Sequence, residues 1–230
     1  MVAYQLQKVF EFLPDLVSAI PLTLGVLFAS LFWGSVLGAG LAWAQVAGDA
    51  TVKKIAQGFI FVMRCTPPIV LIFLVFYGLP EFLNWWLAIN INDWSQSIFT
   101  VVAMSLLYSA TLSEVFQSAY EAIPQGQTEA GLSIGLTSPQ VLVRIVLPQA
   151  LRVALPNVTN SILNLLKDIA LAYTVGLVDI MGASNLLISR NIGNYSLETY
   201  TAAAILYWGL SLILTLLMQW WERELTPAVG

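Results

Sequence analysis

Charged side chains stand at a few positions within the long apolar segments of this 230-residue chain. Arg64 precedes a Thr-Pro-Pro sequence, Glu114 lies in the next apolar segment, and Lys167 and Asp168 are adjacent in the one after that. A charge at the centre of a bilayer costs roughly 2.5–3.5 kcal/mol, so such groups pair, face water or bind a charged solute. The chemistry that they offer is electrostatic recognition of a polar solute.

Each of these groups allows more than one interpretation. Arg64 belongs to an inner gate or contacts a substrate carboxylate, or else its long side chain only reaches the membrane interface. Glu114 pairs with Arg64 or Lys167, which is the preferred interpretation, or it binds a substrate amine. Thr66 can satisfy carbonyl groups that the following prolines leave free. Lys167 and Asp168 point about 100° apart on a helix, so each needs another partner.

A stripe of amides accompanies the charges. Asn157, Asn160 and Asn164 follow one another at helical spacing, and Asp168 extends the same face. Such a stripe favours the wall of a water-facing pathway, with a hydrogen-bonded seam between helices as the alternative. The candidate pathway or substrate residues are therefore Arg64, Thr66, Glu114, Asn160, Asn164, Lys167 and Asp168.

Composition disfavours several other kinds of chemistry. The chain has no histidine, which excludes imidazole metal sites and His-dependent catalysis, and one cysteine, which excludes an intrachain disulfide. No pair of acids lies close together within an apolar segment, so an intramembrane enzyme is not expected. A net charge of −4 gives no reason to expect nucleic acid as a partner. We expect neither a metal nor a catalytic residue on this chain.

The elements that position these residues are membrane helices. The chain is 58% hydrophobic and 10% charged, with a mean hydropathy of +0.80, whereas soluble domains carry about 25% charged residues. We predict one all-α integral membrane domain over 1–230. Gly34 and Gly38 form a GxxxG pattern suited to close helix packing. The predicted transmembrane helices cover about 16–46, 66–80, 97–120, 145–178 and 197–221.

The ends and the orientation follow from the same pattern. Residues 1–15 form either a short amphipathic helix with Phe10, Phe12 and Leu13 facing inward or a frayed terminus. An odd number of helices places the termini on opposite sides. With the N-terminus outside, the cytoplasmic segments contain five lysines and arginines and the outside segments contain two. Because positive residues favour the cytoplasmic side, we predict the N-terminus outside, the C-terminus in the cytoplasm, and 121–148 in the cytoplasm.

Residues 121–148 are the longest polar interruption between apolar segments. A short helix from Pro124 is predicted to end near Gly135, where glycine suits a left-handed turn. A second helix is predicted from Ser138 as the N-cap, with Pro139 in the first helical position. The spacing alone is typical of a solvated loop between membrane helices.

This interruption contains a motif. Residues 129–148 match EAA-x3-G-x9-I-x-L-P, so the chain resembles the permease subunits of ABC importers, which carry this motif in a cytoplasmic loop. The flanking sequences IPQGQTEAGLSIGL, LPQALRVALPNVTNSILNLLKD and MRCTPPIVLIFLVFYGLP resemble the polar amino-acid uptake subfamily. A glycine replaces the second alanine. The motif residues are Glu129, Ala130, Gly131, Gly135, Ile145, Leu147 and Pro148.

The resemblance implies a type I ABC importer permease fold with a cytoplasmic coupling helix, in the bacterial cytoplasmic (inner) membrane. It implies a second permease subunit, identical or similar, a dimer of ATPase subunits, and an extracytoplasmic binding protein that delivers an amino acid. The motif loop would seat in a cleft of the ATPase. The chain has no GxxxxGK[ST] phosphate loop, so ATP and Mg are expected on the partner and this chain is not expected to be an enzyme.

Some positions depart from the subfamily pattern. Cys65 stands where glycine is common, and Ile169-Ala170 stands where Thr-Ser is common. The loss of two hydroxyls makes the local surface more apolar and weakens any transfer of substrate identity from relatives. The alternative function is an ATP-independent secondary carrier for a small polar solute. Such carriers usually contain internal repeats, and no repeat is visible in this chain.

Overall fold

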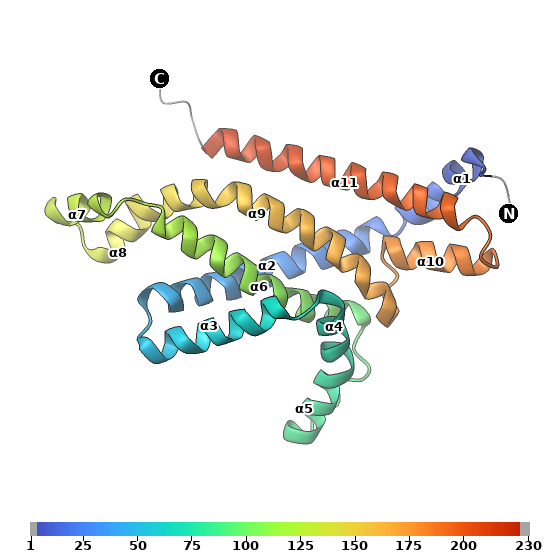
Figure 1. Ribbon diagram of the computed structural model, residues 1–230, viewed down its shortest axis with the longest axis horizontal. Helices are drawn as coiled ribbons and strands as arrows, with labels where there is room; N and C mark the ends of the chain where they lie inside the picture. The colour runs from blue at the N-terminus through green and yellow to red at the C-terminus, as the bar shows by residue number, and fades with distance from the viewer. Residues whose placement is uncertain (1–3, 226–230) are drawn as a thin grey trace.

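The computed structural model describes residues 4–225, which are helical with no strand in that range. The helices form an elongated bundle (Figure 1). They are α1 (Leu6–Val17), α2 (Ile20–Ala47), α3 (Ala50–Cys65), α4 (Pro68–Phe73), the π-helical η1 (Leu74–Gly78), α5 (Leu79–Leu87), α6 (Gln96–Glu121), α7 (Gln125–Ser133), α8 (Ser138–Val141), the π-helical η2 (Leu142–Val146), α9 (Leu147–Ile169), the 3-10 helix η3 (Ala170–Val175), α10 (Ile180–Arg190) and α11 (Ser196–Leu225).

Five helical runs in the described chain are long and apolar enough to cross a membrane, as predicted. Two bounds differ most from the prediction: the second run continues past Pro80 to Leu87, and the fourth begins at Ser138, because the short helix predicted from Ser138 joins the helix predicted over 145–178 without a break. The five runs are Ile20–Ala47, Pro68–Leu87, Gln96–Glu121, Ser138–Val175 and Ser196–Glu224.

Both differences have the same physical reason. A proline inside a helix removes a donor and clashes with the carbonyl four residues earlier. The π-helical η1 ends at Gly78, just before Pro80, and η2 ends at Val146, just before Pro148. A π turn is wider than an α turn, so it accommodates the proline without ending the helix.

Helices α2 and α6 pack closely because α2 presents glycines to α6. A Cβ atom added to Gly38 would lie 3.0 Å from the backbone oxygen of Ser109 and 3.1 Å from Cβ of Leu112. A Cβ atom added to Gly34 would likewise lie 3.4 Å from Cβ of Tyr108. The packing role predicted for the GxxxG pattern is confirmed, and it fixes α6 in the centre of the bundle between α2 and α9.

The N-terminal segment is a helix that packs on α10 and α11. Val9, Phe12 and Leu16 are buried, which confirms an amphipathic helix. The predicted face was partly wrong, since Phe10 is 62% exposed. Helical spacing of three and four residues connects the buried set, whereas Phe10 lies on the opposite side.

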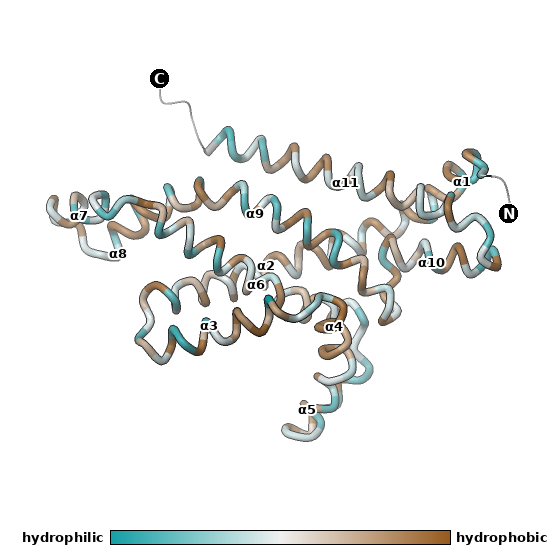
Figure 2. The backbone as a smooth tube through the Cα atoms, in the orientation of Figure 1, coloured by the Kyte–Doolittle hydropathy of each residue, from teal (hydrophilic) through white to brown (hydrophobic). Residues whose placement is uncertain are grey.

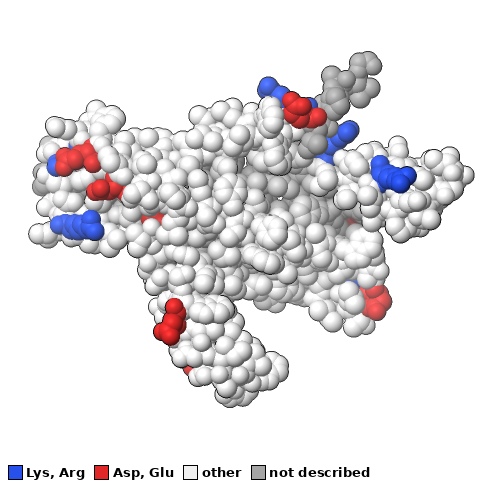
Figure 3. All heavy atoms as spheres, turned by 180° about the vertical axis from the view of Figure 1, so that it is seen from behind, with Lys and Arg blue, Asp and Glu red and all other residues white. Residues whose placement is uncertain are grey.

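Different elements lie at the two ends of the bundle, and charged side chains gather at the ends rather than between them. Figure 1 shows α7 and α8 at one end, α1 and the α10–α11 connection at the other, and α5 projecting from the side. The tube in Figure 2 has many brown stretches along the helices, with teal at α7 and also along parts of α9. On the face in Figure 3, charged side chains gather at the ends and on the projecting segment, and the band between them is almost free of charge. That distribution is typical of a bundle that crosses a bilayer.

Candidate functional site

The motif segment forms two short helices joined by a tight turn, as predicted. We call residues 125–141 the coupling knob. Gly135 has φ +88°, and its N–H donates to Leu132 O at 3.0 Å. The N–H of Leu136 donates to Gly131 O at 3.2 Å, which closes the end of α7. Glycine takes this left-handed conformation without a steric penalty from Cβ, so Gly135 sets the angle between α7 and α8.

The start of α8 differs by one residue from the prediction. Thr137, not Ser138, is the N-cap, and Pro139 lies in the first turn. The reason is Gln140, whose Oε1 accepts from the backbone N–H of Thr137 at 2.9 Å. This reciprocal contact at the third helical position stabilises Thr137 as the cap.

Gly131, which replaces the usual second alanine of the motif, is buried against the following helix. A Cβ atom here would lie 2.8 Å from Val141 Cγ2 and 2.9 Å from Ile145 Cδ1. The glycine therefore lets α7 lie directly on α8 and η2. Gly131 of the coupling knob thus packs against Ile145 of η2, a second motif residue, and this contact fixes the knob on the helix that follows it.

Other motif residues face outward. Glu129 and Ala130 are exposed on α7, and Leu147 is 44% exposed at the start of α9. Pro148 is exposed beside it. Ile134, just before the turn, is 77% exposed and gives the knob an apolar tip. An exposed apolar tip on a compact knob is suited to insertion into a partner.

Arg64 and Glu114 form an ion pair that joins the end of α3 to α6. Both side chains remain about half exposed, at 56% and 41%. Thr66 Oγ1 donates to Val62 O at 2.7 Å, so it satisfies a carbonyl at the proline break, as expected. The preferred interpretation of Glu114 as a partner of Arg64 is confirmed, and these residues link two helices.

A polar cavity of about 360 Å³ lies between α6 and α9. Tyr108 donates its hydroxyl hydrogen to Asp168 Oδ2 at 3.0 Å across this cavity. Lys167 and Asn164 are exposed, and no carboxylate lies within 4.0 Å of Lys167 among the described residues. The cavity thus offers one ammonium and one carboxylate. Its lining residues are Leu107, Tyr108, Thr111, Ser161, Asn164, Lys167 and Asp168.

The structure therefore divides the predicted pathway residues into two groups. Asn164, Lys167 and Asp168 line the cavity, whereas Arg64 and Glu114 form the separate α3–α6 link. Thr66 bonds to Val62 within its own segment, and Asn160 is exposed outside the lining. Sequence reasoning missed Tyr108 and Thr111. Their spacing of three residues places them on one face of the helix, but α6 carries several other hydroxyl residues, and nothing local connects Tyr108 with a carboxylate 60 positions away.

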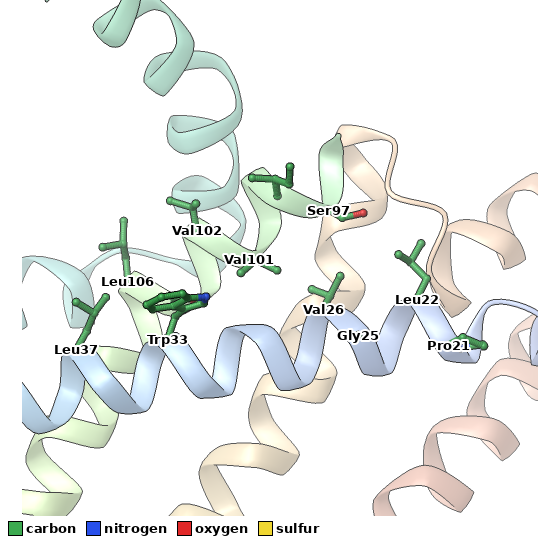
Figure 4. Close-up of a pocket in the computed structure, with 12 residues that line it drawn as sticks. Pro21, Leu22, Gly25, Val26, Trp33, Leu37, Ser97, Val101, Val102 and Leu106 are labelled. Atoms are coloured by element: carbon green, nitrogen blue, oxygen red, sulfur yellow. The ribbon is translucent and has the colours of Figure 1, made fainter. Parts of the chain in front are cut away.

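A larger hollow of about 530 Å³ lies between α2 and α6 (Figure 4). Its walls are apolar apart from the hydroxyls of Ser97 and Ser105, and Trp33 lies across it near Leu106. It contains no charged group, so the smaller polar cavity is the better candidate for a polar solute. Among the described residues, no three His, Cys, Asp or Glu side chains cluster to hold a metal ion.

Residues 34–227 match the family described as "Binding-protein-dependent transport system inner membrane component". The chain belongs to this family, which confirms the resemblance to the membrane-spanning permeases of ABC importers. Its fold and the coupling knob agree with that membership.

Curated relatives extend over nearly the whole chain. It is 35% identical to the L-cystine transport system permease protein TcyL of Bacillus subtilis, over 96% of this chain and 90% of the relative. It is 31% identical to the probable amino-acid ABC transporter permease protein PatM of Vibrio harveyi, over 98% of both.

Solved structures show the same fold. An amino acid ABC transporter crystallised with histidines superposes with a TM-score of 0.83 at 24% identity, over 97% of this chain and 100% of that one. An inward-facing MetNI methionine ABC transporter gives 0.72 at 20% identity, over 92% and 96%. The predicted type I importer permease fold is confirmed.

Proposed function

We propose that this chain is the permease subunit of an ATP-driven importer that takes up an amino acid delivered by an extracytoplasmic binding protein. The coupling knob is the observation that carries this proposal, because two helices fixed by Gly135 present an apolar tip at one end of an apolar bundle. The relatives that are named as cystine and amino-acid permeases support an amino acid as the solute.

The knob would transmit the closure of a partner. A dimer of ATPase subunits holds ATP and Mg, and its clefts receive the coupling knobs of two permease subunits, identical or similar. Closure of the ATPase pair moves the knobs and switches the bundle between outward-open and inward-open states. The protein lies in a bacterial inner membrane with its N-terminus outside and the coupling knob in the cytoplasm.

The polar cavity between α6 and α9 is the part of this chain that suits the solute. An amino acid carries an ammonium and a carboxylate, and the cavity offers a carboxylate at Asp168 and an ammonium at Lys167. Tyr108 holds one oxygen of Asp168 in place. Asn164 adds a neutral amide on the same wall. The proposed solute contacts therefore narrow to Asn164, Lys167 and Asp168.

Reconstituted uptake tests the proposal. Proteoliposomes would contain the permease with a candidate ATPase and a candidate binding protein from the same organism, and uptake of labelled amino acids would be measured with ATP inside or outside the vesicles. We expect uptake that requires ATP on the ATPase side together with the binding protein. Uptake by the permease alone, driven by an ion gradient, would instead favour the secondary carrier.

A further inference from the structure

A strained turn follows α10. We call residues 191–195 the Ile192 turn. Ile192 has φ +56°, Gly193 φ +77° and Tyr195 φ +58°. A left-handed conformation is common for glycine but is an outlier for a β-branched residue. The turn is nevertheless well fixed, because Gly193 N–H donates to Ile188 O at 2.9 Å and Asn194 N–H donates to Asn191 O at 2.9 Å.

The Ile192 turn exposes the apolar side chain of Ile192 at the surface. Ile192 is 91% exposed, more than any other large hydrophobic residue in the described chain. Tyr195 instead packs on α1, with its ring 6.3 Å from that of Phe12 and 5.4 Å from Lys8 Nζ. Tyr195 thus anchors the turn on α1, whereas the side chain of Ile192 stays exposed although its backbone is strained. Strain of this kind concentrates where something binds.

The Ile192 turn lies at the end of the molecule opposite the coupling knob (Figure 1). At the other end of α10, the buried Asp179 accepts from Gly182 N–H at 2.9 Å and from the Tyr207 hydroxyl of α11 at 3.3 Å. Ile180 N–H donates to Thr23 Oγ1 of α2 at 3.2 Å. The chain between η3 and α10 therefore ties the helix that carries the turn to two membrane helices.

This connection also leads to the polar cavity. Helix α9 ends at Ile169, directly after Asp168, and η3 continues from there to the α10 cap. Helix α10 packs against η3. A partner that holds the Ile192 turn would consequently act on a segment continuous with the cavity wall.

We propose that the Ile192 turn is a docking point for the extracytoplasmic binding protein, with Ile192 inserted into an apolar depression of that protein. The proposal rests on the proposed function, which places this end outside the cytoplasm. The family is described as binding-protein-dependent, and the coupling knob occupies the other end. Arg190, in the last turn of α10, is exposed and has no carboxylate within 4.0 Å in the described chain, so it would pair with a carboxylate at the rim of that depression.

The test uses the permease–ATPase complex in nanodiscs and the purified binding protein that supports uptake in the reconstituted system. Ile192→Asn removes the apolar group but suits the left-handed backbone, so the turn is retained. We expect its affinity for the binding protein to fall by about tenfold, which is about 1.4 kcal/mol. Stimulation of ATP hydrolysis by the binding protein falls with it, and basal hydrolysis is unchanged. Leu197→Gln, at a residue that is 65% exposed on the regular helix nearby, is the matched control with less than about threefold loss.

Wild-type affinity in Ile192→Asn would overturn the docking point. A photoreactive amino acid in place of Ile192 gives an independent readout: cross-links to the binding protein support the proposal, and cross-links to lipid alone contradict it. If the binding protein fails to bind or stimulate even the wild-type complex, the proposed function itself is wrong. Stimulation that is equal in wild type and Ile192→Asn would reject only the docking point.

Discussion

At the scale of single residues, Asp168 is the most informative group. It is held by Tyr108 at 3.0 Å on the wall of a polar cavity that also contains Lys167. Because Lys167 and Asp168 are neighbours in the sequence, their side chains point in different directions on the helix, and each is expected to need another partner. In the structure, the partner of Asp168 is the hydroxyl of Tyr108. The hydrogen bond from Tyr108 thus orients the carboxylate, and Asp168 forms no ion pair with another residue of the described chain.

Asp168→Asn tests whether that charge is used. Asparagine can still accept from Tyr108, so the packing is retained while the negative charge is lost. We expect amino-acid uptake to fall by about tenfold, with unchanged binding-protein affinity. Transport by the reconstituted complex is the measurement, and Asp93→Asn, at an exposed loop residue, is the control. Equal uptake by both variants would remove Asp168 from the pathway.

Asp179 predicts a pH dependence of stability. Burial raises the pKa of this carboxyl to about 6, against an ordinary value of 3.8. The folded protein therefore binds the proton more tightly than the unfolded chain, and the resulting stability is present at low pH and lost as the pH rises through about 6. This difference in pKa between the folded and the unfolded chain corresponds to about 3 kcal/mol in the free energy of unfolding.

Asp179→Asn keeps a cap for α10 but does not titrate. Between pH 4 and pH 7, we expect the thermal unfolding temperature of the wild type to fall relative to that of the variant, measured in the same detergent. Parallel curves for the two proteins would show that Asp179 titrates with its ordinary pKa.

At the scale of helices, the packing of α2 on α6 depends on two glycine positions. Gly38 is in contact with Ser109 and Leu112, whereas a Cβ atom on Gly40 would meet nothing within 4 Å. The two glycines lie two residues apart on the same helix, so they separate the effect of contact from that of helix propensity.

We expect Gly38→Ala to destabilise the protein by about 1–3 kcal/mol, because the new methyl group overpacks the interface. Gly40→Ala should be neutral or stabilising by up to about 1 kcal/mol, since alanine favours the helix. Unfolding by heat or denaturant distinguishes them. If Gly38→Ala and Gly40→Ala were equally stable, the close contact of α2 with α6 at Gly38 would not contribute to the free energy of unfolding.

Several elements could be predicted from the sequence because their signals are local. The five apolar helices and the turn at Gly135 are in that class. The continuation of the second helix past Pro80, and the joining of the short helix from Ser138 to the helix predicted over 145–178, could not be predicted, because both depend on π turns. Tyr108 was missed for another reason: its partner lies on a different helix, and no local spacing reports such a contact.

At the scale of the whole molecule, the coupling knob and the Ile192 turn lie at opposite ends of one apolar bundle, with the polar cavity between two of its long helices. The family match and the solved structures define the fold and the class of protein. In the transport mechanism that we propose, a rigid knob transmits the closure of a partner ATPase to these helices.

The ratio of ATP hydrolysed to amino acid taken up tests this claim most directly. Gly135→Val forces a β-branched residue into φ +88° and so changes the angle of the knob, while Glu129→Lys reverses the charge on its exposed face. Gly58→Val, at an exposed position of α3 with open space, is the control. In the reconstituted complex we predict that both knob variants insert and fold but lose uptake by about tenfold or more relative to hydrolysis. A wild-type ratio in both variants would contradict the coupling role of the knob.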